Sequence, residues 1–423
     1  MNSQCAFTIV AKNYIGLATV LKKSFLEHTK DADFYIIVAD EIDDKTPDLP
    51  SDTLIAKEIL KIDSKIWNEC SFKYNITEFC TTIKPRSIEY LLTEKKYDKV
   101  IYLDPDIYCF SDLSPIFNRL DEYKVVLAPH ILTLQENEYT GDLGENIFLG
   151  MGSFNLGFIA VSNSDRVHNL LKWWHRVLIK ECFIDSTRFT ATDQKWMDYA
   201  PMFLSKEELY ITRNMGIDAA PWNFFEREFV KNGDTIYVTN RINKSDDKDK
   251  LLFVHFSSYK YEELSNGIIN HRSLKYVYED LNLIFEKYCS SLSNSDLRKY
   301  LKLEYTYNYF ENGIKISHFN RRLYRGLLDV DIEVGNPFSS GKHSFFYFLK
   351  KRGLIVDRFS QVSLNKANRS NNSYKRITKI IDFILLSIFK IIGIEKYDLL
   401  CRFMIQKLRP ENQTYLYDRI NRG

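Results

Sequence analysis

The chain has 423 residues, of which 45% are hydrophobic and 27% charged, and this balance excludes a protein that is disordered over most of its length. The net charge of +2 is unevenly spread, because the residues from Gly341 to the end include 17 Lys and Arg against 6 Asp and Glu, a local charge of +11 that leaves about −9 for the rest. The basic tail, and not the acidic body, is therefore expected to meet an anionic surface, and no nucleic-acid partner is expected.

The first part of the chain alternates apolar strands with helices. Residues 6–11 have the length and composition of a buried strand, residues 12–28 carry apolar side chains at helical spacing, and residues 33–40 predict a second strand. A strand, a helix and a strand in such close succession predict a βαβ unit, and hence a parallel sheet with functional sites at the carboxyl ends of its strands.

Strand and helix signals continue to about residue 265. Residues 77–98 predict one helix with Pro85 near its first turn. The polar segment 134–152 predicts a loop that could fold over a ligand, and residues 165–183 predict an amphipathic helix opened by Asp165. Further strands are predicted at 99–104, 124–130, 154–162 and 251–261. We therefore expect one α/β domain over residues 1–265.

The C-terminal region changes character. We predict a helical extension packed on the first domain over residues 266–357, a polar linker over 358–375, and a basic amphipathic helical tail over 376–423. Apolar residues nearly encircle the helix at 377–394, so the stretch 376–409 either lies on an anionic membrane or packs on the catalytic body or a partner subunit. The sequence favours neither membrane contact nor packing on protein for this stretch.

The redox and targeting signals are simple. Seven cysteines are scattered without a C-x-x-C pair or a zinc-like Cys/His spacing, which fits a reducing compartment. No signal peptide and no membrane-spanning run is predicted. We expect a cytoplasmic protein, with peripheral contact at the inner face of the plasma membrane as the alternative that the basic tail suggests.

Two acids one residue apart follow the strand that ends the segment YDKVIYLDPDIYCF. Asp104 and Asp106 repel each other at short range unless a cation lies between them. Mg²⁺ or Mn²⁺ prefers such oxygen ligands and keeps positions open for substrate phosphates. A solvated turn is the commoner meaning of this spacing, but the apolar strand before it and the stiffening Pro105 favour a metal site.

The segment VIYLDPDI resembles the D-x-D segment of nucleotide-sugar glycosyltransferases of GT-A fold. The wider arrangement resembles glycosyltransferase family 8 over about the first 260 residues. The resemblance implies an α/β fold class, with a GT-A, Rossmann-like mixed sheet flanked by helices and a mainly α-helical C-terminal region after it. Residues 1–265 would then be the catalytic domain.

Two segments of the family pattern imply contacts with the donor nucleotide. IVAKNY corresponds to the first strand and turn, which implies that Ala11, Asn13 and Tyr14 line the base and ribose. TTIKPRSIEYLL lies where these enzymes carry a basic residue that reaches the donor, so Lys84 is the implied residue and Arg86 its neighbour.

Three later segments imply contacts with the sugar and the metal. FNLGFIAV places Asn155 beside the donor sugar, and ATDQKWMD supplies Asp193 and Gln194 beneath it. FVHFSSYK supplies His255, which the resemblance implies as the third metal ligand, although a lone histidine on a strand is more often part of a core. Lys260 occupies the place of a diphosphate-binding lysine, but the glycine and K-P-W sequence that accompany it in the family are absent.

These residues suit glycosyl transfer from a nucleoside diphosphate. A metal held by Asp104, Asp106 and His255 would stabilise charge on the leaving diphosphate. Asp193 and Gln194 are the candidates for stabilising an oxocarbenium-like sugar. The resemblance implies retention of configuration, a UDP-hexose donor, a saccharide or lipid-linked acceptor, and a role in surface polysaccharide synthesis.

Two other functions are compatible with part of this sequence pattern. A sugar-nucleotide nucleotidyltransferase also places a metal-binding acid on an α/β sheet, but it usually opens with a glycine-rich phosphate loop, and IVAKNYIG is not one. The second alternative is an inactive GT-A scaffold in a polysaccharide assembly complex. The complete set of Asp104, Asp106 and His255 argues against that alternative.

Several weaker candidates lie outside this set. On the predicted helix 165–183, one of Trp173 and Trp174 is expected in the core and the other at a rim. Trp222 and Asn223 lie on a predicted loop and have about an even chance of touching substrate. Three arginines could grip a diphosphate, although a solvated helix face is the commoner meaning: Arg321, Arg322 and Arg325.

Overall fold

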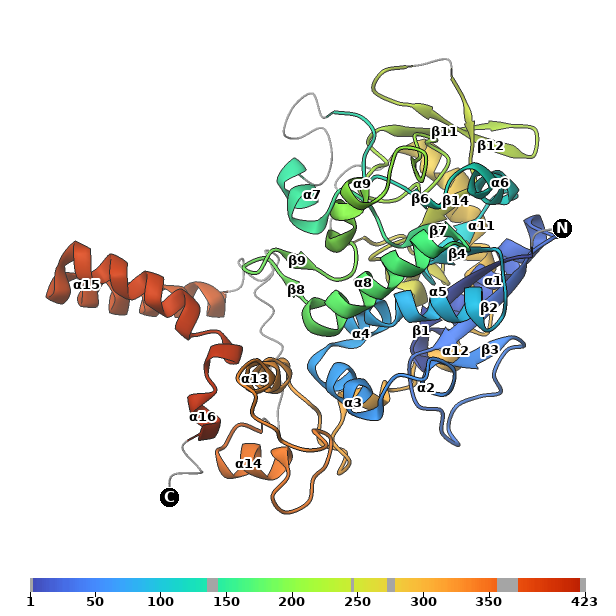
Figure 1. Ribbon diagram of the computed structural model, residues 1–423. Helices are drawn as coiled ribbons and strands as arrows, with labels where there is room; N and C mark the ends of the chain where they lie inside the picture. The colour runs from blue at the N-terminus through green and yellow to red at the C-terminus, as the bar shows by residue number, and fades with distance from the viewer. Residues whose placement is uncertain (1–2, 135–143, 245–246, 272–277, 356–371, 419–423) are drawn as a thin grey trace. The chain divides into compact units, whose positions relative to one another are not determined.

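The computed structural model describes residues 3–134, 144–244, 247–271, 278–355 and 372–418. The chain forms two compact units, Met1–Tyr307 and Asn308–Gly423 (Figure 1). The predicted mixed α/β architecture with a helical C-terminal region is confirmed. The first unit extends about 40 residues beyond position 265 and includes α11 (Asn282–Ser293) and α12 (Leu297–Tyr300).

A seven-stranded mixed sheet forms the centre of the first unit. Its strand order is β10-β6-β7-β4-β1-β2-β3. Strand β7 pairs antiparallel with β4 and β6, whereas the other pairs are parallel. The bounds are β1 (Gln4–Val10), β2 (Asp33–Val38), β3 (Thr53–Ile55), β4 (Lys99–Leu103), β6 (Val125–Leu127), β7 (Phe158–Ser162) and β10 (Leu209–Ile211).

The alternation of side chains along a strand assigns helices to the two faces of this sheet. Ile101 and Leu103 of β4 belong to the same buried cluster as the apolar side of α1 (Ile15–His28). Tyr102 lies between them in sequence and points to the other face, where the ammonium of Lys84 on α5 (Lys84–Thr93) lies 4.1 Å from the centre of its ring. Helix α8 (Asp165–Glu181) packs against α5 on that face (Figure 1).

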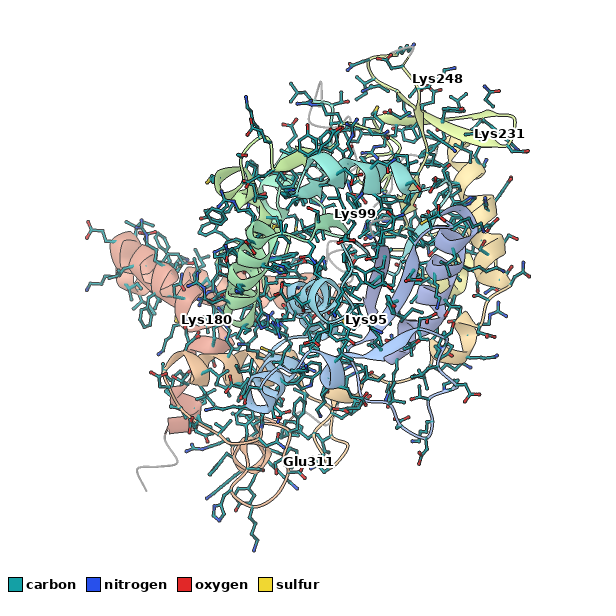
Figure 2. The ribbon with its side chains drawn as sticks, turned by 45° about the vertical axis from the view of Figure 1, so that its right-hand side comes forward. Lys95, Lys99, Lys180, Lys231, Lys248 and Glu311 are labelled. Atoms are coloured by element: carbon teal, nitrogen blue, oxygen red, sulfur yellow. The ribbon has the colours of Figure 1, made fainter. Side chains whose placement is uncertain are left out.

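Smaller sheets complete the first unit. Strand β5 (Ile107–Cys109) pairs antiparallel with β14 (Phe253–His255), and β8 (Ile184–Asp185) pairs with β9 (Thr190–Ala191). A third sheet has the order β11-β12-β13, and Lys231 and Lys248 extend from its edges into solvent (Figure 2). Its bounds are β11 (Arg227–Asn232), β12 (Thr235–Asn240) and β13 (Asp249–Lys250).

Short helices connect these strands: α2 (Ala56–Ile59), α3 (Ser64–Lys73), α4 (Ile76–Thr82), α6 (Ser114–Glu122), α7 (Glu145–Met151), α9 (Ala200–Phe203) and α10 (Tyr261–Leu264). The second unit is helical. It contains α13 (His318–Asp329), α14 (Phe345–Lys351), α15 (Asn372–Lys407) and α16 (Tyr415–Asp418). Helix α15 is interrupted at Gly393, whose φ of 77° is not helical. In the parts of the chain that the structure describes, no helix is long and apolar enough to cross a membrane.

Several sequence predictions for these elements were wrong in detail. The single helix at 77–98 is two helices, because Pro85 lies in the first turn of α5 and cannot donate the backbone hydrogen bond that would continue α4. The predicted loop 134–152 contains α7, and its residues 135–143 lie outside the described ranges. Helix α8 begins at Asp165 as predicted, and Ser164 caps it by accepting from the amide of Val167. Residues 358–371 of the predicted linker also lie outside the described ranges.

Candidate active site

Backbone pairing brings the two acids and the distant histidine together. Strand β4 ends at Leu103, and the amide of the next residue, Asp104, donates to the carbonyl of Gly157 at 2.8 Å. Strand β5 begins one residue after Asp106 and pairs with β14, so that Ile107 lies opposite His255. The amide of Phe256 donates to the carbonyl of Asp106 at 2.9 Å. Residues about 150 positions apart in sequence thus become neighbours through one strand pair.

The side chains of Asp104, Asp106 and His255 converge on one point. Their candidate ligand atoms all lie within 4.8 Å of one another. His255 Nε2 is 3.0 Å from Asp106 Oδ1 and 3.8 Å from Asp104 Oδ2. Two carboxylate oxygens and one imidazole nitrogen are ligands that Mn²⁺ or Mg²⁺ accepts, and three protein ligands leave positions for substrate oxygens. The residues present therefore fit a divalent metal.

The pKa values of the three side chains depend on burial and on the charges that they exert on one another. Burial raises the pKa of Asp104, and the nearby charge of Asp106 adds to that effect, although Lys84 and His255 act against it. Burial also acts to raise the pKa of Asp106, but the charge and hydrogen bond of His255 outweigh it and lower this pKa. Burial acts to lower the pKa of His255, but the acids around it raise that pKa well above its usual value.

Two tyrosines orient the carboxylates. The hydroxyl of Tyr102 donates to Asp104 Oδ1 at 2.5 Å, and the hydroxyl of Tyr261 donates to Asp106 Oδ2 at 2.8 Å. Each carboxylate therefore has one oxygen held by a hydroxyl and one directed toward His255. Sequence reasoning missed both tyrosines. Tyr102 lies on β4 two residues before Asp104, and this spacing is the local signal that could have found it.

Gly157 is the residue that permits this close approach. A methyl group at its Cα would lie 2.4 Å from Cε1 and 2.7 Å from Nδ1 of His255, and 2.7 Å from Oδ1 of Asn155. These distances are shorter than carbon contacts allow, so a side chain here would displace the imidazole. The glycine in FNLGFIAV is therefore needed for the packing of β7 against the histidine.

A buried ion pair lies beside the cluster. Lys84 Nζ is 2.5 Å from Asp193 Oδ2, and both side chains are at most 3% exposed. Lys84 also donates to the carbonyl of Leu156 at 2.7 Å and lies over the ring of Tyr102. The indole of Trp174 donates to the backbone carbonyl of Asp193 at 3.2 Å. The structure therefore holds Lys84 beneath the surface as the partner of Asp193, so its direct contact with a diphosphate remains a prediction.

Asn155 and Gln194 are also buried and bonded to the protein. Asn155 Oδ1 accepts from the amide of Gly157 at 3.0 Å, and its Nδ2 is 3.4 Å from His130 Nε2. Gln194 Nε2 donates to the carbonyl of Met151 at 3.0 Å, at the end of α7. His130, which sequence reasoning missed, is buried between the rings of Phe148 and Trp222.

The predicted nucleotide-binding residues follow β1, which neighbours β4 in the sheet. Ala11 is buried, and Asn13 Oδ1 has no hydrogen-bond partner among the described residues. The ring of Tyr14 packs edge-on against Tyr261, 5.7 Å between centroids, and so reaches the group that holds Asp106. Lys260 differs from the rest, because its side chain is 56% exposed and pairs with Glu263 at 2.7 Å.

Similarity to known proteins indicates the class of enzyme. Residues 5–195 match the family described as glycosyl transferase family 8. The protein is a glycosyltransferase that resembles family 8. The match includes Asp104, Asp106, Asn155, Asp193 and Gln194, whereas His255 lies beyond it.

Individual relatives are distant. The uncharacterized protein YfnF of Bacillus subtilis (strain 168) is 23% identical over 293 residues, which cover 67% of this chain and 90% of YfnF. The galactosyltransferase LgtC, solved with donor and acceptor sugar analogs, is 14% identical with a TM-score of 0.40, covering 69% of this chain and 96% of LgtC. The glycosyltransferase GlyE of Streptococcus pneumoniae TIGR4 is 14% identical with a TM-score of 0.37, covering 74% and 67%. Because both TM-scores are low, these two structures do not indicate the role of any individual residue in this chain.

The structure assigns positions to the weaker candidates of the glycosyltransferase. Trp174 is fully buried and Trp173 is half-buried among Trp196 and Phe203, as the amphipathic pattern predicts. Trp222 packs on the ring of His255, 5.2 Å between centroids. The expectation of a solvated face for the arginines of α13 was wrong, because all three are at least nine-tenths buried: Arg321, Arg322 and Arg325.

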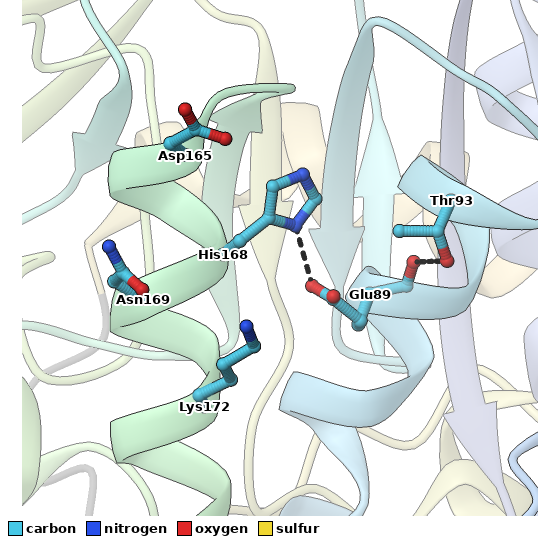
Figure 3. A pocket seen from close by; sticks show the side chains of 6 residues that line it. All are labelled: Glu89, Thr93, Asp165, His168, Asn169 and Lys172. Carbon is cyan, nitrogen blue, oxygen red and sulfur yellow. Dashed lines mark hydrogen bonds and ion pairs between the residues drawn. The ribbon is translucent and has the colours of Figure 1, made fainter.

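A surface hollow lies away from these residues. It has a volume of about 470 Å³ and opens between α5 and α8, where His168 Nδ1 lies 2.8 Å from Glu89 Oε2 (Figure 3). A second hollow of about 420 Å³ is lined by residues on both sides of Asp193 and Gln194 in sequence, including Phe189, Thr190, Lys195 and Tyr199. Neither hollow contains a residue of the Asp104, Asp106 and His255 cluster.

Proposed function

We propose that this glycosyltransferase is metal-dependent and transfers a hexose, with retention of configuration, from a UDP-sugar to a saccharide or lipid-linked acceptor in surface polysaccharide synthesis. The observation that carries the proposal is the convergence of Asp104, Asp106 and His255. Each acid has one oxygen bonded to a tyrosine and another facing the histidine, which is the arrangement that a cation with both protein and substrate ligands requires.

In this proposal Asp104, Asp106 and His255 hold Mn²⁺ or Mg²⁺. The bound ion would supply Lewis-acid stabilisation of charge on the leaving diphosphate. Tyr102 and Tyr261 keep the carboxylates oriented, which reduces the reorganisation needed when donor binds. Lys84 and His255 act to lower the pKa of Asp104, but burial outweighs them and this pKa stays raised, so a bound cation would supply the compensation that the ionised acid lacks.

Asp193 and Gln194 are proposed to act at the sugar. A carboxylate and an amide oxygen beside an oxocarbenium-like carbon would stabilise its positive charge. The ion pair with Lys84 offsets the cost of burying the carboxylate of Asp193, and the indole of Trp174 donates to the backbone carbonyl of the same residue. The same pair links α5 to the segment that carries Asp193. Asn155 would contact the sugar from the adjoining edge of β7.

The test is a donor panel with product analysis. Purified full-length protein is heated with each nucleotide sugar in the presence and absence of Mn²⁺, because a bound ligand raises the melting temperature. Products are then separated from reactions that contain saccharide acceptors. Metal-dependent stabilisation by one donor together with metal-dependent transfer or hydrolysis supports the proposal. No product from any donor would favour the inactive scaffold, and pyrophosphate release from a nucleoside triphosphate would favour the nucleotidyltransferase.

We further propose that the tail contacts the anionic cytoplasmic face of the membrane. Helix α15 exposes large apolar side chains on both sides of Gly393, among them Phe383, Ile391 and Phe403, each at least 59% exposed. Exposed basic residues accompany them: Arg376, Lys379, Lys390 and Lys396. Apolar burial in the headgroup layer and attraction to anionic lipid would then act together.

Liposome flotation tests the tail. Full-length protein should float with vesicles that contain anionic lipid and float less as salt is raised, because charge attraction is screened. Protein ending at Phe359 should remain at the bottom of the gradient. Equal flotation of the two would contradict the proposal and leave packing on the catalytic unit or on a partner subunit as the function of α15.

A further inference from the structure

The two ring nitrogens of His255 face different acids. Nε2 faces Asp106 and Asp104, as described above, whereas Nδ1 lies 3.5 Å from Oδ1 of Asp218. The imidazole is 4% exposed and has Gly157 against its edge, so the ring has little room to turn. A neutral imidazole carries one proton on one nitrogen, and only the other nitrogen can bind a metal.

Asp218 is held in place by its backbone. Its carbonyl accepts from Asn223 Nδ2 at 3.0 Å, and the carbonyl of the next residue, Ala219, accepts from the amide of His255 at 2.7 Å. The φ of Asp218 is 56°, a left-handed conformation that is uncommon for residues with a side chain but that aspartate adopts more readily than most. These bonds couple the position of Asp218 directly to β14, the strand that carries the histidine.

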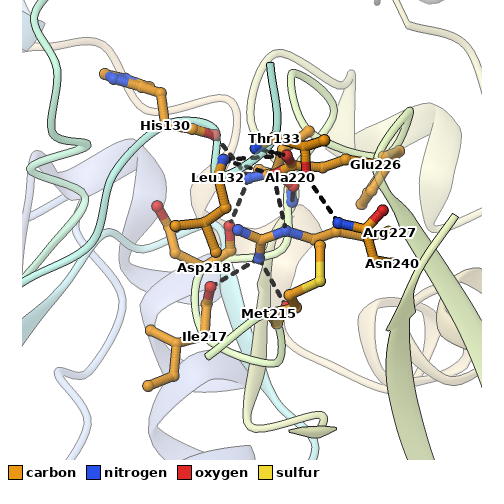
Figure 4. Close-up of polar contacts among 12 residues, drawn as sticks. His130, Leu132, Thr133, Met215, Ile217, Asp218, Ala220, Glu226, Arg227 and Asn240 are labelled. Carbon is orange, nitrogen blue, oxygen red and sulfur yellow. Dashed lines mark hydrogen bonds and ion pairs between the residues drawn. The ribbon is translucent and has the colours of Figure 1, made fainter. Parts of the chain in front are cut away.

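The carboxylate of Asp218 is completely buried and lacks an ordinary hydrogen bond. It is 0% exposed, and neither of its oxygens has a hydrogen-bond partner among the described residues. The neighbouring guanidinium of Arg227 is directed elsewhere, because its Nη1 donates to the carbonyls of Met215 and Ile217 at 2.8 and 2.7 Å (Figure 4). An unpaired buried carboxylate is costly, so a donor that approaches it is strongly favoured.

We propose that Asp218 is a positioning residue for the metal site, accepting the Nδ1–H of His255 so that the Nε2 lone pair points at the ion. Metal-binding histidines generally donate their second ring N–H to a carboxylate or carbonyl, which sets the tautomer and raises the basicity of the ligand. A contraction of 3.5 Å to ordinary hydrogen-bond length needs a shift of only a few tenths of an ångström. This inference rests on the proposed metal site.

The chain supplies a matched control in Glu226. This acid is also 0% exposed and lies near Arg227, but its carboxylate accepts from the amides of Leu132 and Thr133 and does not face His255 (Figure 4). Glu226→Gln therefore removes a buried charge from the same loop without touching the histidine. Asp218→Asn removes the charge but keeps an acceptor, and Asp218→Leu removes both.

The first measurement is Mn²⁺ binding to the full-length protein without donor, followed by the electron paramagnetic resonance of free Mn²⁺. We expect about 10- to 100-fold weaker binding for Asp218→Leu, a smaller loss for Asp218→Asn, and a change within about twofold for Glu226→Gln. Equal binding by both Asp218 variants and the wild type would overturn the inference. Absence of binding by the wild type would instead overturn the metal site itself, so the two failures are distinguishable.

The second measurement does not depend on the stability of an Asp218 variant. Wild-type protein with ¹⁵N-labelled histidine is loaded with Mg²⁺, and the ring signals of His255 are assigned by their loss in His255→Gln. We expect the tautomer with the proton on Nδ1. A proton on Nε2 in the Mg²⁺-loaded protein would overturn the inference, because that nitrogen could then not bind the ion.

Discussion

The two halves of the proposed active site differ in how their charges are compensated. We call them the metal-facing half, proposed to hold the cation, and the sugar-facing half, proposed to face the donor sugar. In the metal-facing half, Asp104 and Asp106 share one histidine, and their side chains are 29% and 15% exposed. In the sugar-facing half, Asp193 is paired one-to-one with Lys84, and both are almost completely buried. The first half has an excess of negative charge that an external cation can satisfy, whereas the second is already neutral. A group of residues that binds a cation needs negative charge left unpaired, whereas residues held in place for a substrate can have their charges paired within the protein.

The largest effect is expected from breaking the metal-facing half. Asp106→Asn keeps the shape of the side chain but removes the charge that faces His255, so Mn²⁺ binding and metal-dependent donor binding should fall by about 100-fold or more. Isothermal titration with Mn²⁺ measures this. Asp112→Asn is the control, because Asp112 Oδ1 accepts from the amide and the hydroxyl of Ser114, bonds that an asparagine oxygen can also accept. An unchanged Mn²⁺ titration for Asp106→Asn would show that the metal site is wrong.

The sugar-facing half should respond in stability as well as in turnover. Asp193→Ala should spare Mn²⁺ binding and lose turnover, and it should also destabilise the fold by about 3–5 kcal/mol, because Lys84 is left charged and buried. The double variant Lys84→Met with Asp193→Leu should recover most of that stability while staying inactive. Urea unfolding measures the first effect. Full stability of Asp193→Ala would mean that the ion pair is not buried in solution.

The free energy of unfolding should fall in acid because of His175, the neighbour in sequence of Trp174, which bonds to the backbone of Asp193. Burial, helped by the charge of Arg86, lowers the pKa of His175 on α8 to about 4. The stability that this neutral histidine contributes is complete above pH 6.5, the unfolded value, and is lost as pH falls toward 4, because the unfolded state binds the proton first. At about 1.4 kcal/mol per pKa unit, the loss reaches roughly 3 kcal/mol. His175→Leu should flatten this slope in urea unfolding, whereas the exposed His343→Gln should not.

The smallest effect tests the contact between the halves. Gly157→Ala would place a methyl group against the ring of His255 and against Asn155, which belong to the metal-facing and sugar-facing halves respectively. We expect Mn²⁺ binding to weaken about 10-fold through displacement of the ring, in the range expected when a group that supports a metal ligand is lost. Gly150→Ala, which has open space around it, is the control. Equal Mn²⁺ affinity for both variants would show that the histidine does not need this contact.

Local patterns were sufficient for most of the fold and for part of the site. An apolar run followed by Asp104 and Asp106 predicted a strand with acids at its carboxyl end, because the period of a strand and the chemistry of its last residues are both local. Pro85 was predicted in a first turn and lies in one. The same reasoning misjudged Arg321 on α13, because an amphipathic pattern does not say which other segments will cover its polar side.

Other features depended on tertiary structure. His255 was implied by family resemblance alone, and its place beside Asp106 follows from the pairing of β14 with β5. Tyr261 and Asp218 had no signal in the sequence, since each contacts the site through bonds to residues that lie distant in the chain or on another strand. The sequence by itself determined the buried strands β1, β2, β4 and β7, the helices α1 and α8, and the acids of the D-x-D segment. Only the tertiary structure decided which nitrogen of His255 faces the acids, because strand register and close packing, not composition, set the direction of a buried side chain.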